Sequence, residues 1–350
     1  NKKVYKKFKG KNYNVIYFNK NSFLNRTSLF LNKISLIRKL VLKLKLNFFQ
    51  NLLKKKNINF LIFVTPSKLV YYLRYIDFVT TVWEIQHKSS PSLKEYKNPY
   101  YDLLDRDEIC KFISLYSYKI FVGTKKSRSE FSKYFNCDQK RFVIKMTPSL
   151  IIETANQKNI KFNENKIGNY LFYPAQFWSH KNHLYIIEAF LEFKKRNIDI
   201  KCVFVGSDKG YLKVIKEKIS KYELEDYFVI KDYLSNEDIV KLYLNCKAVV
   251  VPSIVGTYTF PHIEGFYFEK VVFSNRGNLD EIFHDKIVEL SLDNPKSFVT
   301  RYLDFLEDKE GKFKKMIKMN KNFYDENISV SHNKNIYKNV LDQYLSEIVS

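Results

Sequence analysis

Short apolar runs, rich in β-branched and aromatic residues, alternate with longer amphipathic segments along this chain. The runs have the length of buried strands, and the segments between them have the apolar spacing of helices. Strands that alternate with helices pair into parallel sheets, and the helices cover both faces of each sheet. The predicted strands are residues 14–18, 59–64, 78–82, 119–122, 141–145, 170–173, 201–205, 227–230, 248–251 and 270–273. The predicted helices include residues 28–55, 107–116, 126–134, 184–196, 212–221 and 239–245.

A polar stretch divides these strands into two sets of five. Residues 152–168 are rich in Asn and Lys and have no apolar period, which is typical of a domain boundary. We therefore predict an α/β protein of two Rossmann-like domains facing a cleft, at residues 1–152 and 166–334. A last helix, at residues 335–350, is expected to return to the first domain. Ligands of doubly wound sheets bind outside the carboxyl ends of strands, so we expect the site in that cleft.

The chain carries a formal net charge of +23, from 60 Lys and Arg against 37 Asp and Glu. Such a charge favours anionic partners, namely nucleic acid, anionic lipid headgroups or phosphorylated small molecules. Residues 32–57 mix apolar residues with Lys and Arg and contain no acidic residue. This segment is either a domain helix with its lysines in water or a surface that rests on an anionic membrane. No apolar run approaches the ~18–20 residues that span a bilayer.

The four cysteines are widely spaced and form no C-x-x-C pair, which argues against a metal or redox motif. We expect Cys110, Cys137, Cys202 and Cys246 to be buried thiols in a reducing compartment, and therefore expect a cytoplasmic protein. No secretory signal is recognised. Because the chain starts at Asn1 rather than at Met, we expect that an N-terminal piece is missing.

The stretch YPAQFWSHKNH, residues 173–183, gathers polar and aromatic side chains between a predicted strand and a predicted helix. Gln176 and Lys181 therefore lie in a loop above the carboxyl end of a strand. A lysine at such a place can hold a phosphate as a point charge, although a loop lysine on its own is weak evidence.

A second polar loop follows the predicted strand 248–251. Pro261 marks the start of a helix there, because the missing N–H of proline costs nothing in a first turn. The N–H groups of that turn, together with the helix dipole, form an anion site. Glu264 falls one turn inside this helix. Its carboxylate either complements the dipole or accepts hydrogen bonds from the hydroxyls of a ribose.

Together, YPAQFWSHKNH and PSIVGTYTFPHIEGF resemble the donor-binding half of the retaining GT-B glycosyltransferases of family four, glycosyl transferases group one. The resemblance covers residues 170–285. It implies that Lys181 holds a nucleotide diphosphate and that Glu264 is the second glutamate of the family's Glu-x7-Glu signature. Gln176 stands in place of the family's arginine, and Gly256 stands in place of its first glutamate.

These two departures change what we expect of the donor site. Gly256 has no side chain for the donor sugar, so main-chain amides of residues 258–260 are expected to hold the sugar and phosphate. Ser207 and Tyr233 are expected beside the base. The implied donor-binding residues are Gln176, Lys181, Gly206, Ser207, Tyr233, Thr257, Tyr258, Thr259, Phe260, Pro261 and Glu264. The implied catalytic residues are Lys181, Glu264 and His87.

Residues 77–91 resemble the acceptor-side loop of the same family, with Trp83 in place of a common histidine. The implied acceptor-side residues are Trp83, Glu84, His87 and Arg106. His87 is either a solvated loop histidine or a partner for a sugar hydroxyl. The sequence Asp-Arg-Asp at 105–107 imitates a metal-binding motif of another transferase fold, but here it opens a helix rather than ending a strand, so we expect no metal.

The resemblance implies metal-independent hexosyl transfer with retention, with a nucleotide-diphosphate sugar as donor and no further cofactor. The acceptor is expected to be a glycan, such as a surface polysaccharide, lipopolysaccharide or lipid-linked oligosaccharide, at the inner face of the cytoplasmic membrane. One alternative is a basic nucleic-acid-binding protein, which is disfavoured because the motifs gather at strand ends rather than along a basic stripe. Another alternative is a degenerate sugar-nucleotide binder, suggested by Gln176 and Gly256.

Overall fold

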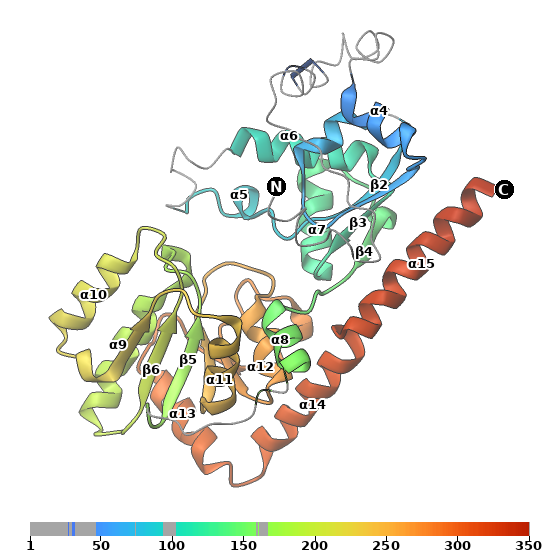
Figure 1. Cartoon of the computed structure of the whole chain (residues 1–350). Coiled ribbons are helices and arrows are strands. Elements are labelled where there is room, and N and C mark those ends of the chain that lie inside the picture. The colour runs from blue at the N-terminus through green and yellow to red at the C-terminus, as the bar shows by residue number, and fades with distance from the viewer. Residues whose placement is uncertain are drawn as a thin grey trace. The chain divides into compact units, whose positions relative to one another are not determined.

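The computed structural model describes residues 27, 30–31, 47–73, 75–93, 103–158, 160 and 167–349 (Figure 1). The predicted strand at 14–18 and most of the basic segment at 32–57 lie outside these residues. Within the described ranges, no helix has an apolar run long enough to cross a bilayer.

The described residues form two compact units. The first lies within Asn1–Trp83, Asp102–Phe121 and Phe135–Val143, and the second lies within Glu84–Tyr101, Val122–Tyr134 and Ile144–Ser350. The domain limits and the return of the last helix to the first domain stay predictions.

The first sheet has the strand order β1-β2-β3-β4, and the pairs β1–β2 and β2–β3 are parallel. Its strands are β1 (Phe60–Phe63), β2 (Asp77–Thr81), β3 (Lys119–Val122) and β4 (Phe142–Ile144), at the predicted places. The helical elements of this unit are α4 (Phe48–Lys55), η1 (Lys68–Tyr72), α6 (Leu103–Tyr116) and η3 (Gln139–Arg141). The guanidinium of Arg141 donates to the main-chain oxygens of Ser114 and Ser117, so it satisfies carbonyls at the end of α6.

The second sheet has the order β10-β9-β8-β5-β6-β7, and all its strand pairs are parallel. The chain fills one side from β5 to β7, crosses back to β8 beside β5, and then fills the other side. The junction of β5 and β8 is therefore the topological switch point, where sheets of this kind bind their ligands. The strands are β5 (Tyr170–Pro174), β6 (Lys201–Val205), β7 (Phe228–Lys231), β8 (Ala248–Val251), β9 (Val271–Ser274) and β10 (Val288–Glu289).

Helices cover both faces of the second sheet, as predicted. Figure 1 shows α9 (His183–Lys195) and α10 (Leu212–Lys221) on one side, and α11 (Asn236–Asn245) and α12 (Phe260–Tyr267) on the other. Aromatic rings fill the layers between them: Phe172 of β5 meets Tyr243 of α11 edge to face, with ring centroids 4.9 Å apart. Later helices complete the unit, namely α13 (Ser297–Glu307), α14 (Lys312–Asn327) and α15 (Val330–Val349).

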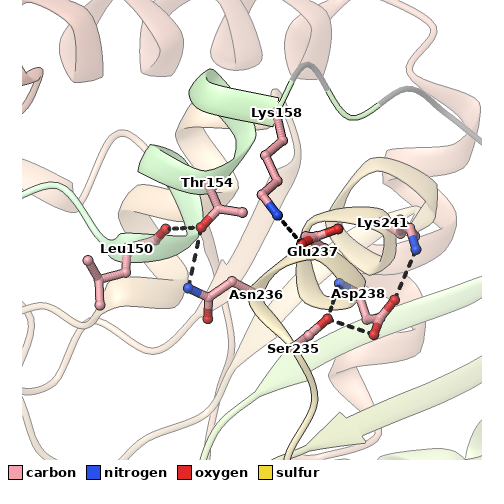
Figure 2. A network of polar contacts seen from close by, with 8 residues as sticks. All are labelled: Leu150, Thr154, Lys158, Ser235, Asn236, Glu237, Asp238 and Lys241. Carbon is pink, nitrogen blue, oxygen red and sulfur yellow. Dashed lines mark hydrogen bonds and ion pairs between the residues drawn. The ribbon is translucent and has the colours of Figure 1, made fainter. Parts of the chain in front are cut away.

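The polar stretch that was predicted as a domain boundary begins inside a helix that was not among the predicted ones. Helix α8 (Leu150–Lys158) packs on α11 through both apolar and polar contacts, and its Ile152 is fully buried in the core of the unit. Figure 2 shows this contact: the Asn236 amide donates to the Thr154 hydroxyl at 3.3 Å, and Lys158 forms an ion pair with Glu237. Within α8 the apolar core is reached by Ile151, Ile152 and Ala155, and so short an apolar face leaves no clear period in the sequence.

The start of α11 is capped by the side chain of Ser235. The Ser235 hydroxyl oxygen accepts from the main-chain N–H of Asp238 at 3.1 Å, and the Ser235 hydroxyl donates to the Asp238 carboxylate at 2.7 Å (Figure 2). Lys241 then donates to the same carboxylate at 3.0 Å. These contacts fix the end of the helix that α8 touches.

Other differences from prediction are short elements. A helix of four residues, α5 (Gln86–Ser89), forms within the predicted loop at 77–91, and strand β10 has only two residues.

Helix α12 begins where Pro261 predicts, with Thr259 as N-cap. All four cysteines are buried free thiols, as expected.

Candidate functional site

Two loops leave the second sheet side by side at its switch point. Strands β5 and β8 are neighbours in register, with Leu171 opposite Ala248. The main-chain N–H of Ile254 donates to the carbonyl of His180 at 3.0 Å and joins the loop after β8 to the loop after β5. The Tyr173 hydroxyl adds a second link, because it donates to the Lys181 carbonyl at 2.8 Å and lies 3.1 Å from the Ser253 hydroxyl. Lys181 is thus held at the edge of both strands.

Gln176 is exposed, and Trp178 fixes the orientation of its side-chain amide. The indole N–H of Trp178 donates to Gln176 Oε1 at 2.9 Å. An indole nitrogen can only donate, so the oxygen of the amide must face Trp178. The NH₂ group of Gln176 then points elsewhere and has the polarity that an anion requires. Gln176 can therefore still donate where the family has an arginine, but without the charge.

Gly206 allows the loop after β6 to touch the loop after β5. A Cβ atom at Gly206 would lie 2.3 Å from the Ala175 carbonyl oxygen and 2.8 Å from the Gln176 Cα. The next residue, Ser207, accepts from the Phe177 N–H through its main-chain carbonyl at 3.1 Å. No side chain fits at position 206, so glycine is required there for packing. The donor contacts predicted for Gly206 and Ser207 stay predictions.

The buried residue that follows the Lys181 loop is uncharged, although it is a histidine. His183 has no exposed surface, and its ring centroid is 4.8 Å from that of Tyr173 and 4.9 Å from that of Phe204. Burial lowers the pKa of His183 to about 3, and the nearby Lys181 ammonium acts in the same direction. His183 is therefore an uncharged core residue at neutral pH, and the positive charge of this loop lies on Lys181.

His262 fastens the first turn of α12 to the sheet. The main-chain N–H of Thr259 donates to His262 Nδ1 at 3.2 Å, so the ring hydrogen lies on Nε2, which is 2.9 Å from the Ser274 hydroxyl. Ser274 in turn donates to the Val251 carbonyl at 2.9 Å. Burial lowers the pKa of His262 to about 3, with a further contribution from the Lys181 charge. Lys181 and the N-terminus of α12 belong to two loops that are hydrogen-bonded to each other at one edge of the sheet.

The hydrogen bond to His262 uses the N–H of Thr259, which was one of the amides predicted to hold the donor. The predicted anion donors of this turn are then the N–H groups of Tyr258 and Phe260. The Phe260 side chain is 42% exposed, and Pro261 is buried within the first turn. The dipole of α12 still adds positive potential at this end.

Glu264 is buried, at 4% exposure, and its hydrogen-bond partners are protein hydroxyls. The Tyr243 hydroxyl donates to Glu264 Oε2, and Ser149 also forms a hydrogen bond with the carboxylate. Burial raises the pKa of Glu264, while the two hydrogen bonds act in the opposite direction. The carboxyl group therefore links α11, α12 and the residue before α8. Its predicted contact with a ribose stays a prediction.

The loop before α12 is held from its other side by α7 (Lys125–Phe135). The hydroxyls of Ser127 and Thr257 lie 2.8 Å apart, and the Asp280 N–H donates to the Thr257 carbonyl at 2.9 Å. Asp280 also accepts from the N–H of Lys126 at 2.7 Å and of Ile282 at 3.2 Å, so one buried carboxylate caps two helical turns. These contacts fix the position of Thr257.

Tyr258 turns its side chain into the protein. A Cβ atom at Gly123 would lie 2.1 Å from the Tyr258 ring, so the ring occupies space that only a glycine leaves open. The ring also stacks on Phe283, with centroids 6.0 Å apart. Burial raises the pKa of the Tyr258 hydroxyl to about 12. Tyr258 can therefore meet a donor only through its main chain.

The predicted acceptor-side residues fall in both units. Glu84 and His87 belong to the second unit, where the Glu84 carboxylate accepts from the Gln86 N–H at 2.9 Å and His87 is buried. Trp83 and Arg106 belong to the first unit. Next to Arg106, Asp105 lies inside α6 and pairs with Lys68, and within the described ranges no His, Cys, Asp and Glu side chains cluster as metal ligands.

One predicted residue lies apart, and one neighbour of the site was missed. Tyr233 follows the edge strand β7 and is 83% exposed, so it is not gathered with Lys181. Gln86 lies beside Gly256: a Cβ atom there would be 3.4 Å from Gln86 Nε2. The only sequence signal for Gln86 was its place between Glu84 and His87.

Residues 154–324 match the model of the family Glycosyl transferases group 1. This match includes both loops of the site and confirms the predicted resemblance to glycosyl transferases group one over that part of the chain. No curated protein sequence matches the chain significantly.

Most of the chain is similar to several solved glycosyltransferases. HepE of Anabaena in complex with UDP-glucose has a TM-score of 0.61 and 14% identity, covering 81% of this chain and 79% of its own. A glycosyltransferase from Rickettsia africae ESF-5 has a TM-score of 0.63 and 18% identity, covering 97% and 88%. WaaG, a glycosyltransferase involved in lipopolysaccharide biosynthesis, has a TM-score of 0.58 and 15% identity, covering 83% and 80%. At these identities the likeness establishes the fold, a mixed α/β architecture with parallel sheets in Rossmann-like domains.

Proposed function

We propose that this chain is a retaining, metal-independent glycosyltransferase that moves a hexosyl group from a nucleotide-diphosphate sugar to a glycan acceptor. The observation that carries the proposal is that the loop with Lys181 and the loop that leads into α12 leave neighbouring strands at one carboxyl edge and are joined by the Ile254–His180 hydrogen bond. The match to Glycosyl transferases group 1 supports it, as does the likeness to HepE, which is known with UDP-glucose bound.

The diphosphate of the donor would lie between Lys181 and α12. Negative charge grows on its oxygens as the bond to the sugar breaks. The Lys181 ammonium and the N–H groups at the start of α12 would stabilise that charge, and such fixed donors are effective because they need no reorganisation during the reaction. The NH₂ group of Gln176 would add a neutral donor beside them.

Retention follows if the acceptor attacks from the face that the diphosphate leaves. A diphosphate oxygen would then accept the proton of the acceptor hydroxyl, so no pair of carboxylates at glycosidase spacing is required. Glu264 would accept from the ribose hydroxyls through carboxylate lone pairs that the Tyr243 and Ser149 hydroxyls leave available. Ser207 and Tyr233 would lie near the base, with Tyr233 the weaker candidate because it is largely exposed.

The acceptor is proposed to be a growing surface glycan or a lipid-linked oligosaccharide. The likeness to WaaG, which acts in lipopolysaccharide biosynthesis, supports this class. Trp83, Glu84, His87 and Arg106 remain the predicted acceptor-side residues. The net charge of +23 suits a cytoplasmic enzyme that meets an anionic membrane surface where such acceptors reside.

A panel of nucleotide sugars tests the function. Thermal stabilisation by one donor, followed by transfer or hydrolysis detected by mass spectrometry, is the expected result. Stabilisation without turnover of any donor would support the degenerate binder suggested by Gln176 and Gly256. Binding of an oligonucleotide at physiological salt, with no response to nucleotide sugars, would support the basic nucleic-acid-binding protein instead.

A further inference from the structure

The donor loop has no side chain at position 256, where the resembling family carries a glutamate. Gly256 has φ +114, a conformation that only glycine adopts readily, so the loop presents main chain alone at this position. A Cβ atom built there would lie 3.4 Å from Gln86 Nε2 and 3.5 Å from Thr259 Cγ2. The amide of Gln86 therefore borders the space into which a side chain at position 256 would extend.

We propose that Gln86 contacts the transferred sugar of the donor and helps to determine which sugar is accepted. This inference rests on the proposed function. An amide both donates and accepts hydrogen bonds, as the hydroxyls of a sugar do. Among the described residues, the Gln86 side chain forms no hydrogen bond, so both of its polar atoms are available to a ligand.

The main chain of Gln86 and that of the loop with Gly256 are both fixed within the second unit. The Gln86 N–H donates to the Glu84 carboxylate at 2.9 Å, and the Gln86 carbonyl accepts from the Ser90 N–H at 2.7 Å. The neighbours Ile85 and His87 are buried and anchor α5. On the other side, the contact of Thr257 with Ser127 fixes the loop. A sugar beside Gly256 would thus meet the Gln86 side-chain amide on a preorganised backbone, which lowers the entropic cost of binding.

The chemistry of the neighbours favours the sugar over the diphosphate as the ligand of Gln86. The positive potential of the site comes from Lys181 and the N-terminus of α12. Gly256 lies three residues before the N-cap Thr259, and therefore outside the first turn of the helix. A diphosphate is best held by cations and N–H donors, whereas a neutral amide suits uncharged hydroxyls.

Paired affinities for a nucleotide and its sugar derivative test the proposal. Isothermal titration is done with UDP, UDP-glucose, UDP-N-acetylglucosamine, GDP and GDP-mannose on the wild-type protein, Gln86→Met and Gln86→Asn. Gln86→Met keeps the length of the side chain and removes both polar atoms, while Gln86→Asn keeps the amide but withdraws it. Ser89→Ala, on the same short helix, is the matched control.

We expect Gln86→Met to bind the sugar nucleotide about 5- to 20-fold more weakly, as for one or two lost hydrogen bonds, and to bind the free nucleotide within about twofold of wild type. Gln86→Asn should show an intermediate loss, and Ser89→Ala should show none. Equal effects on the sugar nucleotide and the free nucleotide, or no effect on either, would overturn the role of Gln86 alone. If the wild-type protein binds none of the probes, the proposed function is overturned, and this inference with it.

Discussion

The main-chain N–H of Ile254 donates to the carbonyl of His180 at 3.0 Å and joins the loop that leads into α12 to the loop that carries Lys181. His262 in turn accepts the Thr259 N–H and fixes the first turn of α12. The cation and the N-terminus of the helix are therefore held as one unit, although more than seventy residues separate them. This arrangement suits an anion with two adjacent charged groups, such as a diphosphate.

Removing the Lys181 charge should weaken transfer. We expect Lys181→Ala to lower kcat/KM for the donor by about 10²-fold, on the scale of one lost contact to a developing oxyanion. Lys213→Ala, which removes an exposed lysine from α10, is the control and should leave activity unchanged. Steady-state kinetics and a circular dichroism spectrum of each variant make the measurement. A folded Lys181→Ala variant with wild-type kinetics would disprove the diphosphate site.

Two buried histidines should make the protein less stable in mild acid. The pKa values of His183 and His262 are lowered to about 3 in the folded state, against ~6.5 in an unfolded chain. Below pH ~6.5 the unfolded state binds more protons, so stability is complete above that pH and falls as the pH falls. At pH 5 each histidine should cost about 2 kcal/mol of unfolding free energy. Urea denaturation at pH 7 and pH 5 measures the difference.

His183→Phe separates this effect from the titration of carboxylates. Phenylalanine can occupy the aromatic surroundings of Tyr173 and Phe204 and has no proton to bind. The variant should therefore lose about half of the change between pH 7 and pH 5. An unchanged pH dependence in His183→Phe would show that this histidine is not held neutral in the folded protein.

The sequence predicted the strands best where burial on both faces leaves a continuous apolar run. The ranges 119–122, 201–205 and 248–251 agree with β3, β6 and β8 residue for residue. The loops after β5 and β8 were also placed correctly at one edge of the sheet, because parallel strands bring their carboxyl ends to the same edge. Pro261 correctly predicted the start of α12 because its meaning is local to one turn.

Tertiary contacts between distant segments were beyond the sequence pattern. Helix α8 combines a few apolar contacts with polar ones such as Asn236 to Thr154, and so short an apolar face leaves no clear hydrophobic period. Asp280 holds α7 across 154 residues of sequence, and nothing around it signals that partner. The approach of Gln86 to Gly256 is of the same kind, since it depends on how two loops pack.

Glu264 offers a test of the ribose contact. If its carboxylate binds the ribose, the wild-type protein should prefer UDP over 2′-deoxy-UDP by about tenfold, and Glu264→Gln should reduce that preference. Tyr243→Phe removes one of the two hydroxyl partners of Glu264 but leaves the carboxylate and its hydrogen bond with Ser149, so it should keep the preference. Titration of the two nucleotides against all three proteins gives the answer. A preference that is equal in wild type and Glu264→Gln would assign Glu264 a purely structural role.

Gly206 should tolerate no side chain, because the loops after β5 and β6 touch there. In Gly206→Ala the new Cβ would approach the Ala175 carbonyl oxygen to 2.3 Å, and a main-chain atom cannot rotate away as a side chain can. We expect a loss of about 2 kcal/mol in unfolding free energy, typical of overpacking, and weaker donor binding because Gln176 must move with Ala175.

Gly277→Ala is the matched control for this prediction. Its Cβ would lie 3.3 Å from the Asn275 side-chain oxygen, a contact that a small movement of that side chain relieves. Urea denaturation and nucleotide titration are measured on both variants. Because the added Cβ would displace both Ala175 and Gln176, the stability and the donor affinity of Gly206→Ala should fall together. Gly277→Ala should stay close to wild type in both quantities. A Gly206→Ala variant that is as stable as Gly277→Ala would mean that the two loops are not in contact.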